Sequence, residues 1–274
     1  VWIVACACLA AGCFPWRAPE TLPEFDSVEA AQKADRDAFF LNLSAAQLKS
    51  WPQGLEALDG LRKLSLRHAR MGPLPETIGE IAGLRWLDVA HMNLESLPTS
   101  LMRLNDLAYL YASDNRLQTL GDHIGALPSL LYLNLDRNAL TSLPPEIGRL
   151  ENLKWLRVNG NRLESLPGAM GDLSQLRRLY LRSNALTGLP GSFEQLDALT
   201  DLSLSDNKLT QIPACVAGME ALERLDLERN GINVLPEDLS GLRHLKWLRL
   251  DGNPLGPEEE SRIKAALPEC MVLL

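Results

Sequence analysis

Aromatic side chains recur at a fixed interval in the middle of the chain. Trp86, Tyr109, Tyr132 and Trp155 are each separated by 23 residues. With their neighbours they form a candidate binding set: Trp86, Tyr109, Tyr111, Tyr132, Trp155, Arg157, Arg178, Tyr180 and Arg182. Aromatic rings and guanidinium groups dominate the energetics of binding interfaces. Aromatic residues make up only 5% of the sequence, so their concentration here predicts a surface that recognises a partner.

Three possible metal ligands share a second column at the same interval, namely His68, His91 and Asp114. If the three belong to neighbouring strands, they form a straight row with a step of about 4.8 Å. A tetrahedral ion needs ligands that converge on it from several directions. We therefore expect a solvated polar column with no metal, and no other cofactor.

Motifs for catalysis are absent from the sequence. It has no phosphate-binding loop, dinucleotide fingerprint, zinc-binding helix pattern or Gly-x-Ser-x-Gly elbow. Cys215 and Cys270 have no histidine or basic residue at an activating position. We expect Cys215 to be half-exposed and both thiols to be inert, so the sequence predicts a protein that is not an enzyme.

These columns belong to a 23-residue repeat that runs without insertion from Ala38, with the pattern LxxLxLxxNxLxxLPxxIGxLxx. Ten repeats begin at Ala38, Leu61, Leu84, Leu107, Leu130, Leu153, Leu176, Leu199, Leu222 and Leu245. Positions 4 and 6 are two residues apart, so they face one side of a short strand. Positions 3, 5 and 7 are then expected to face the other side. A single repeat cannot bury its apolar side, and stacking against neighbours does so.

The pattern resembles the leucine-rich repeat family in its 23-residue form. The resemblance implies an α/β solenoid, shaped as a horseshoe with a parallel concave β-sheet and short helical or irregular convex segments. It also implies that the position-9 asparagines bond backbone groups of the turn after each strand: Asn115, Asn138, Asn161, Asn184, Asn207, Asn230 and Asn253. The first three repeats carry Ala46, Ala69 and Met92 instead, so we expect a less stable N-terminal end.

The first 37 residues are predicted to form a leader, a tether and an N-terminal cap. Residues 1–13 predict a signal peptide, and Leu9 to Cys13 resembles the lipobox of bacterial lipoproteins, in which the cysteine is lipidated. Residues 14–37 predict an extended, proline-containing tether through residue 25 and then an N-terminal capping helix through about Ala38. Asp26 and Glu29 form the expected capping pair, and the helix is expected to cover the first edge of the solenoid.

The remaining two units are a solenoid over residues 38–256 and a C-terminal cap over residues 257–274. Pro257 followed by three glutamates suits the first turn of a helix. Its apolar side is expected to hold Ile263, Ala266 and Leu267. The segment that follows resembles the closing strand of bacterial leucine-rich repeat lipoproteins.

Composition excludes several other classes. The 274 residues carry 27 basic and 35 acidic side chains, a net charge of −8, which disfavours binding to nucleic acid or directly to anionic lipid. Five cysteines are too few for a disulfide scaffold. No apolar run reaches the ~18 residues that span a membrane. We expect a monomer whose one membrane contact is the lipid anchor.

Three functions stay open. The first is a non-catalytic protein-binding module, lipid-anchored in the bacterial envelope at the outer membrane or in the periplasm. The second is a glycan-binding surface protein whose rings stack on sugars. The third is a cytoplasmic signalling regulator or effector, similar to intracellular plant proteins with this repeat. A basic zone beside the acidic residues Asp201, Asp226 and Glu228 favours a protein partner, although Arg178, Asp201 and Arg224 also fit a plain ladder of ion pairs.

Overall fold

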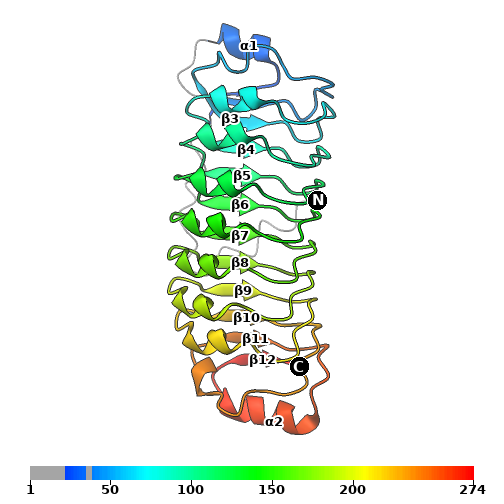
Figure 1. The fold of residues 1–274 in the computed structure, drawn as a ribbon, viewed down its shortest axis with the longest axis vertical. Helices are drawn as coiled ribbons and strands as arrows, with labels where there is room; N and C mark the ends of the chain where they lie inside the picture. Colours follow the sequence, from blue (N-terminus) through cyan, green and yellow to red (C-terminus); the bar gives the residue numbers. More distant parts are fainter. Residues whose placement is uncertain (1–21, 35–38) are drawn as a thin grey trace.

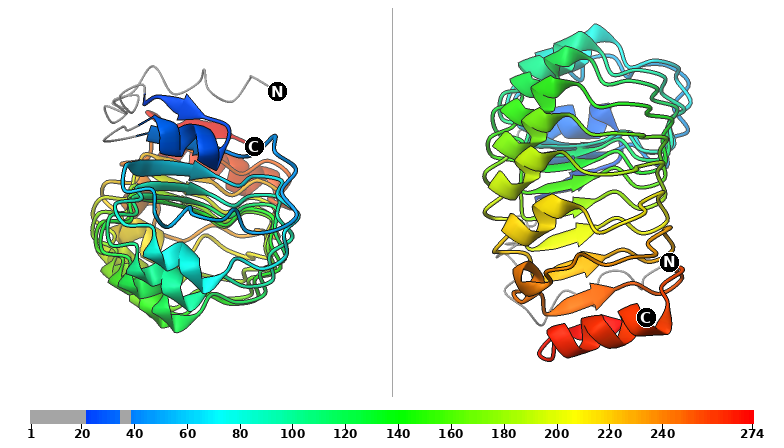
Figure 2. Two further views of the ribbon diagram at one scale, coloured as in Figure 1. Left: turned by 90° about the horizontal axis from the view of Figure 1, so that it is seen from above. Right: turned by 60° about the horizontal axis from the view of Figure 1, so that its bottom comes forward.

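The chain folds as an elongated solenoid. The computed structural model describes residues 22–34 and 39–274. Over these residues the strands line one side of the solenoid and short 3₁₀ helices line the opposite side (Figures 1 and 2). The described strands form one 12-stranded parallel sheet whose spatial order follows the sequence. The predicted solenoid with a parallel sheet is therefore confirmed.

Each strand is short because the chain turns away after positions 3 to 5 of each repeat. The described strands are β1 (Glu24–Phe25), β2 (Phe39–Asn42), β3 (Leu61–Ser65), β4 (Trp86–Asp88), β5 (Tyr109–Tyr111), β6 (Tyr132–Asn134), β7 (Trp155–Arg157), β8 (Arg178–Tyr180), β9 (Asp201–Ser203), β10 (Arg224–Asp226), β11 (Trp247–Arg249) and β12 (Met271–Leu273). The residue after position 7 adopts a left-handed backbone in most repeats, as at Asp114 and Asp206. This turn directs the chain away from the sheet.

The convex side is built from 3₁₀ helices, namely η1 (Glu76–Glu80), η2 (Thr99–Arg103), η3 (Asp122–Ala126), η4 (Pro145–Arg149), η5 (Gly168–Asp172), η6 (Gly191–Gln195), η7 (Ala214–Gly218) and η8 (Ser240–Leu242). Most follow the proline of a Leu-Pro step, as η4 follows Pro144 and η5 follows Pro167. Proline fixes an extended approach to the helix and needs no hydrogen bond for its nitrogen. Successive 3₁₀ helices stack closely. A Cβ added to Gly148 would lie only 2.2 Å from the carbonyl oxygen of Ala169 on the next helix.

The core is one continuous column of aliphatic side chains between the sheet and the convex side. Positions 4 and 6 are buried as predicted, and Leu87, Val89, Leu156 and Val158 have no exposed surface. The buried residues of all repeats belong to a single cluster. Each repeat is therefore stabilised by its neighbours, as expected of a solenoid.

The position-9 asparagines form the predicted ladder. The side-chain nitrogen of Asn161 donates to the carbonyl groups of Leu135 and Val158 at 3.0 and 3.1 Å. Its side-chain oxygen accepts a hydrogen bond from the backbone nitrogen of Leu140 at 3.0 Å. The same pattern recurs from Asn115 to Asn253. Each amide thus satisfies backbone groups of its own repeat and of the preceding one.

The N-terminal end differs from the sequence prediction. Glu24 and Phe25 do not continue the tether but form β1, which pairs with β2 and is the first strand of the sheet. Helix α1 (Val28–Lys33) begins after Ser27, whose hydroxyl accepts a hydrogen bond from the backbone nitrogen of Ala30. Asp26 is therefore not the capping residue, because the serine lies one residue closer to the first turn. Residues 35–38, and with them Ala38, lie outside the described residues.

The C-terminal end has a helix and a strand where the sequence predicts them. Helix α2 (Pro257–Ala266) starts at a proline and buries Ile263. Strand β12 then pairs with β11. Glu259 and Arg262 of α2 bind the backbone nitrogen and oxygen of Leu235 at 3.1 and 2.9 Å, which fixes the helix to the last repeats (Figure 1).

Cys215 is a correction to the sequence analysis. Its side chain is buried, with 6% of the residue exposed, instead of half-exposed. It lies on η7 among the core residues, and Ser100, at the same position of η2, is buried as well. Cys215 and Cys270 are both free thiols.

No helix in the part of the chain that the structure describes is long and apolar enough to cross a membrane.

Candidate partner-binding face

Five rings form an unbroken line on the sheet face that points away from the core. We call Phe40, Trp86, Tyr111, Tyr132 and Trp155 the aromatic row. The ring centroids of successive members are separated by 5.7, 5.2, 4.9 and 5.8 Å. Interplanar angles between 35° and 80° show tilted and edge-on contacts, the arrangements that aromatic quadrupoles favour.

The row leaves the position-3 column at β5 and returns to it at β6, which the sequence columns do not show. Trp86 pairs with Tyr109 in strand register, but its ring contacts Tyr111, which is two residues further along β5. Tyr111 in turn contacts Tyr132, whose register partner is again Tyr109. The predicted residues Trp86, Tyr111, Tyr132 and Trp155 are therefore brought together. Tyr109 lies beside them on β5, half-buried.

Phe40 and Lys63 extend this surface and were left out of the predicted set. The ring of Phe40 continues the row toward the N-terminus. The ammonium group of Lys63 lies 6.0 Å from the centroid of that ring, and burial lowers its pKa. Both residues occupy position 3 of the repeat, as Trp86 does. Extending the binding set along this column toward the N-terminus would have included them.

The tyrosines of the row are partly buried by their neighbours. Burial raises the pKa of Tyr132 and of Tyr111, and a hydrogen bond with Trp86 acts in the opposite direction on the pKa of Tyr111. Both phenols therefore stay neutral at ordinary pH. They offer a partner an apolar ring with a hydroxyl group at its edge.

The row ends at an arginine. The guanidinium carbon of Arg178 lies 4.4 Å from the ring centroid of Trp155, within the range of a cation–π contact. Arg157 makes a similar contact with Tyr180 at 5.4 Å. The predicted aromatic and basic residues thus form one surface over β4 to β8.

The predicted basic and acidic zones are not separate, because the arginines are paired with carboxylates. Arg157 lies 2.7 Å from Asp136, Arg178 lies 3.7 Å from Asp201 and Arg182 lies 2.8 Å from Asp206. Arg224 also approaches Asp201, at 3.4 Å. We call the set from Arg178 to Arg249 the ion-pair network: Arg178, Arg182, Asp201, Asp206, Arg224, Glu228, Arg229 and Arg249. The ladder of ion pairs through Arg178, Asp201 and Arg224, which the sequence analysis gave as an alternative, is therefore present.

Position 7 lines the open face in only some of the repeats, as at the exposed Arg182, and not in all of them as predicted. Ala90, Ser113, Asp136, Ser205 and Glu228 are all buried, with at most 4% of their surface exposed. At three of these residues, Ala90, Asp136 and Glu228, a side-chain turn ends the strand. The carboxylate of Asp88, at position 5, accepts a hydrogen bond from the backbone nitrogen of Ala90 at 2.9 Å, an arrangement in which aspartate and asparagine mimic a backbone turn. Asn134 and Asp226 do the same.

The histidine column forms stacked rings. The rings of His68 and His91 lie 4.6 Å apart at an angle of 26°, and Nε2 of His91 lies 3.3 Å from Asp114. Burial lowers the pKa of His91, which Asp114 partly opposes. Asp114 also binds Arg137 at 2.5 Å. Among the described residues, no three histidine, cysteine, aspartate or glutamate side chains are grouped so that they could hold a metal ion.

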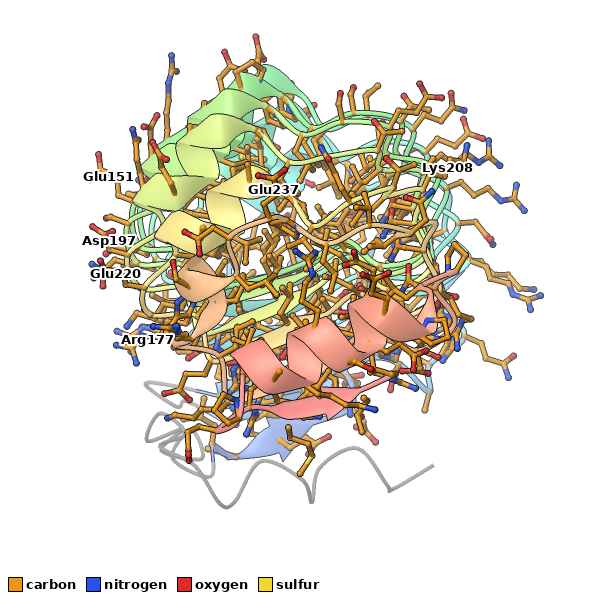
Figure 3. All side chains as sticks on the ribbon, turned by 90° about the horizontal axis from the view of Figure 1, so that it is seen from below. Glu151, Arg177, Asp197, Lys208, Glu220 and Glu237 are labelled. Carbon is orange, nitrogen blue, oxygen red and sulfur yellow. The ribbon has the colours of Figure 1, made fainter. Side chains whose placement is uncertain are left out.

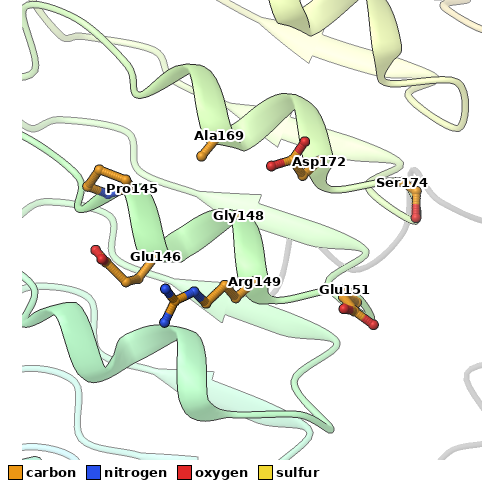
Figure 4. A pocket seen from close by; sticks show the side chains of 8 residues that line it. All are labelled: Pro145, Glu146, Gly148, Arg149, Glu151, Ala169, Asp172 and Ser174. Atoms are coloured by element: carbon orange, nitrogen blue, oxygen red, sulfur yellow. The ribbon is translucent and has the colours of Figure 1, made fainter.

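A shallow groove lies on the convex side between η4 and η5 (Figure 4). Its volume is about 530 Å³, and Glu146, Arg149 and Asp172 line it. Gly148 and Ala169, where the two 3₁₀ helices lie close together, also line it. The groove follows from helix stacking and has no aromatic lining residue, so the sheet face is the better candidate for partner binding.

The repeats match known families. Residues 117–207 match the family described as leucine-rich repeat region, and residues 82–140 and 213–255 match the family described as leucine rich repeat. No curated protein sequence is similar enough to match the chain.

Solved structures share the architecture. A leucine-rich repeat protein of Leptospira interrogans is 23% identical, with 92% of this chain and 99% of that chain aligned and a TM-score of 0.52. An internalin of Listeria monocytogenes is 21% identical over 82% of this chain and 70% of that chain, with a TM-score of 0.67. These two show the shared fold.

The Arabidopsis receptor kinase HAESA, solved with the peptide hormone IDA and the co-receptor SERK1, is more similar in sequence. It is 30% identical over 81% of this chain and 39% of that chain, with a TM-score of 0.69. Together with the matches between residues 82 and 255, the asparagine ladder and the parallel sheet, these similarities show that the chain belongs to the leucine-rich repeat family.

Proposed function

We propose that the chain is a protein-binding module that recognises its partner along the aromatic row and the adjoining arginines. The observation that carries the proposal is the continuous line of ring contacts that ends with Arg178 over Trp155. The strands hold these rings in fixed register, so little side-chain freedom is lost when a partner binds. Aromatic residues and arginine are the types that most often dominate binding energy.

Two further points support a polypeptide partner. The surface combines half-buried rings with paired charges, so a partner can meet apolar area and both signs of charge within a few strands. HAESA, a related repeat protein, is a receptor that was solved with a peptide hormone. The aromatic row offers recognition and no reactive group, and leucine-rich repeat modules are usually non-catalytic.

The test uses selection of displayed peptides on the folded chain, with a glycan array in parallel. Trp155→Ala combined with Tyr132→Ala is expected to weaken a selected peptide by about 1,000-fold, since hot-spot rings contribute on the order of 2 kcal/mol each and about 1.4 kcal/mol is a factor of ten. Trp247→Ala is the matched control, because Trp247 occupies the same column on β11 but lies outside the row. Unchanged peptide binding in the double variant would exclude this face.

The glycan-binding alternative has its own outcome in the same experiment. Binding of neutral sugars that depends on Trp155 and Tyr132, without any peptide selected, would replace the protein partner by a glycan. Rings that stack on sugars and rings that anchor peptides are the same groups. The ligand class is therefore decided by what binds and not by which variant loses binding.

We also propose that the module is anchored at a bacterial envelope through a lipid on Cys13. The support is the sequence Leu9 to Cys13 alone, which lies outside the described residues. Expression with the native leader, followed by fractionation and intact mass, tests it. A lipid-sized mass increase and membrane partitioning, both lost in Cys13→Ser, are expected. An unmodified soluble chain that retains residues 1–12 would favour the cytoplasmic alternative.

A further inference from the structure

A second surface lies on the flank of the solenoid, immediately after the asparagine ladder. Position 10 of the repeat carries a basic residue in every second repeat, at Arg70, Arg116, Arg162 and Lys208, which are each 46 residues apart. The repeats between them carry small or uncharged residues: Asn93, Ala139, Ala185 and Gly231. The cations are therefore separated by regular gaps.

The backbone holds this row rigidly. The backbone nitrogen of Arg116 donates to the carbonyl oxygen of Leu94 at 2.8 Å, and that of Arg162 donates to Leu140 at 2.9 Å. The intervening residue Ala139 donates to Leu117 in the same way, at 2.9 Å. Neighbouring strands are about 4.8 Å apart, so alternate repeats place the cations about 10 Å apart along a line of roughly 30 Å.

The four cations are exposed and lack acidic partners. In the described ranges, none of them has a carboxylate within the 4.0 Å of an ion pair, in contrast to Arg178 and Arg182 on the sheet face. Two glutamates, Glu95 and Glu164, share this flank at position 12 without reaching that distance.

The opposite flank carries charges of both signs. Figure 3, which looks along the solenoid from its C-terminal end, shows Lys208 projecting from one flank and Glu151, Asp197, Glu220 and Arg177 from the other. An acidic chain of net charge −8 therefore presents a line of unpaired cations on one side, and a polyanion would be attracted to that side.

The surroundings of the row are rich in hydroxyl groups. Thr141, Ser142, Ser165, Thr187 and Thr210 follow the row at positions 12 and 13, and all are exposed. Hydroxyl groups donate and accept hydrogen bonds. This stretch therefore matches a ligand that itself carries many hydroxyl groups between widely spaced negative charges.

We propose that this flank binds an acidic polysaccharide with one anionic group per disaccharide. Its charges recur at an interval comparable to that of the four cations, and its hydroxyl groups meet the threonine and serine side chains. A nucleic-acid strand has a phosphate every ~3.4 Å, which would leave most phosphates unmatched. An acidic polypeptide would lack the hydroxyl groups and is the alternative outcome of the test.

The test measures binding of hyaluronan, which has one carboxylate per disaccharide, to the full chain at several salt concentrations. Arg116→Gln combined with Arg162→Gln is expected to weaken binding at least about tenfold and to lower the slope of log K against log salt by up to about two. The matched control is Arg103→Gln with Arg149→Gln, which removes the same charge from exposed residues of η2 and η4 and is expected to bind like the native chain.

A second variant separates spacing from charge. Arg116→Ala combined with Ala139→Arg keeps the net charge but moves one cation by a single strand. Binding is expected to fall about as far as for loss of Arg116 alone, and circular dichroism checks that the variant is folded. Native-like affinity in this variant, no hyaluronan binding at low salt, or tighter binding of polyglutamate than of hyaluronan would each overturn the proposal. Native-like hyaluronan binding by the Trp155→Ala, Tyr132→Ala variant distinguishes this surface from the aromatic row.

Discussion

Arg178 joins the two halves of the sheet face, because its guanidinium carbon lies 4.4 Å from the centroid of Trp155 while its Nε lies 3.7 Å from Asp201. The aromatic row is thereby connected to the ion pairs that Asp201 makes with Arg178 and Arg224. A cation held between a ring and a carboxylate has a defined position, which a partner can recognise without reorganising it.

The coupling between Trp155 and Arg178 can be measured by a double-mutant cycle of Trp155→Leu and Arg178→Gln in urea unfolding. We expect a coupling energy of about 0.5–1 kcal/mol, typical of a partly exposed cation–π contact. The cycle of Trp247→Leu with Arg178→Gln is the control, since β11 is three strands from β8, and no coupling is expected. Equal coupling in both cycles would show that the effect is not specific to the contact.

The asparagine ladder predicts a large cost for a small change. Asn161→Ala removes one acceptor and up to three donated hydrogen bonds at a residue that is 9% exposed. We expect a loss of ~1–3 kcal/mol in the free energy of unfolding, because buried backbone groups lose their partners. Asn152→Ala is the control, since this exposed asparagine makes a single hydrogen bond, to Pro128. An unchanged urea midpoint for Asn161→Ala would contradict the prediction.

The sequence predicts those features that repeat in every unit. Leu87 and Val89 are two residues apart and must share a face, so the core follows from spacing alone. The ladder follows because a buried amide at a fixed position needs the same backbone partners in each repeat. Likewise, a Leu-Pro step fixes where most of the 3₁₀ helices begin.

Features that depend on side-chain direction could not be predicted from columns. The contact of Trp86 with Tyr111 instead of Tyr109 results from how the rings lean along the strands, which register does not specify. Asp136 is buried at a strand end where Asn134 makes a side-chain turn, which forms after some strands and not after others. The pairing of Arg182 with Asp206 depends on a left-handed residue that follows position 7. These are local geometric choices that residue type leaves open.

The convex stack predicts that two glycines respond differently to one added methyl group. Gly148→Ala would place Cβ 2.2 Å from the carbonyl oxygen of Ala169, so the neighbouring backbone must move. We expect a loss of about 1–3 kcal/mol, as for overpacking in a core. Gly188→Ala meets no atom within 4 Å and is expected to be neutral or slightly stabilising. Thermal unfolding of both variants checks this. Equal effects would show that the stacked 3₁₀ helices move apart at little cost in free energy.

The ion-pair network predicts a defined pH dependence. Hydrogen bonds from Arg229 and Arg182 lower the pKa of Asp206. A carboxyl group whose pKa is lower in the folded state stabilises the protein at pH above its ordinary value of ~3.9, and this contribution is lost as the pH falls through the folded-state pKa. Asp206→Asn should therefore cost about 1 kcal/mol at neutral pH and progressively less in acid.

Urea unfolding of the native chain and of Asp206→Asn between about pH 7 and pH 2 measures this difference. Asp197→Asn is the control, because this exposed carboxylate has no ion-pair partner in residues 22–34 and 39–274. A cost of Asp206→Asn that stays constant across the pH range would mean that the two arginines do not act through the charge of Asp206.

The burial of Cys215 predicts that its thiol reacts only after the chain unfolds. Burial raises the pKa of this thiol to about 11, and the thiolate is the reactive form. In the folded chain at pH 8, iodoacetamide should label Cys270, which is half-exposed, before Cys215, although burial also raises the pKa of Cys270. Peptide mapping should find Cys215 labelled only when urea opens η7 and the repeats beside it. Labelling of both thiols at the rate of the unfolded chain would show that this part of the solenoid opens readily and that the core does not protect position 17.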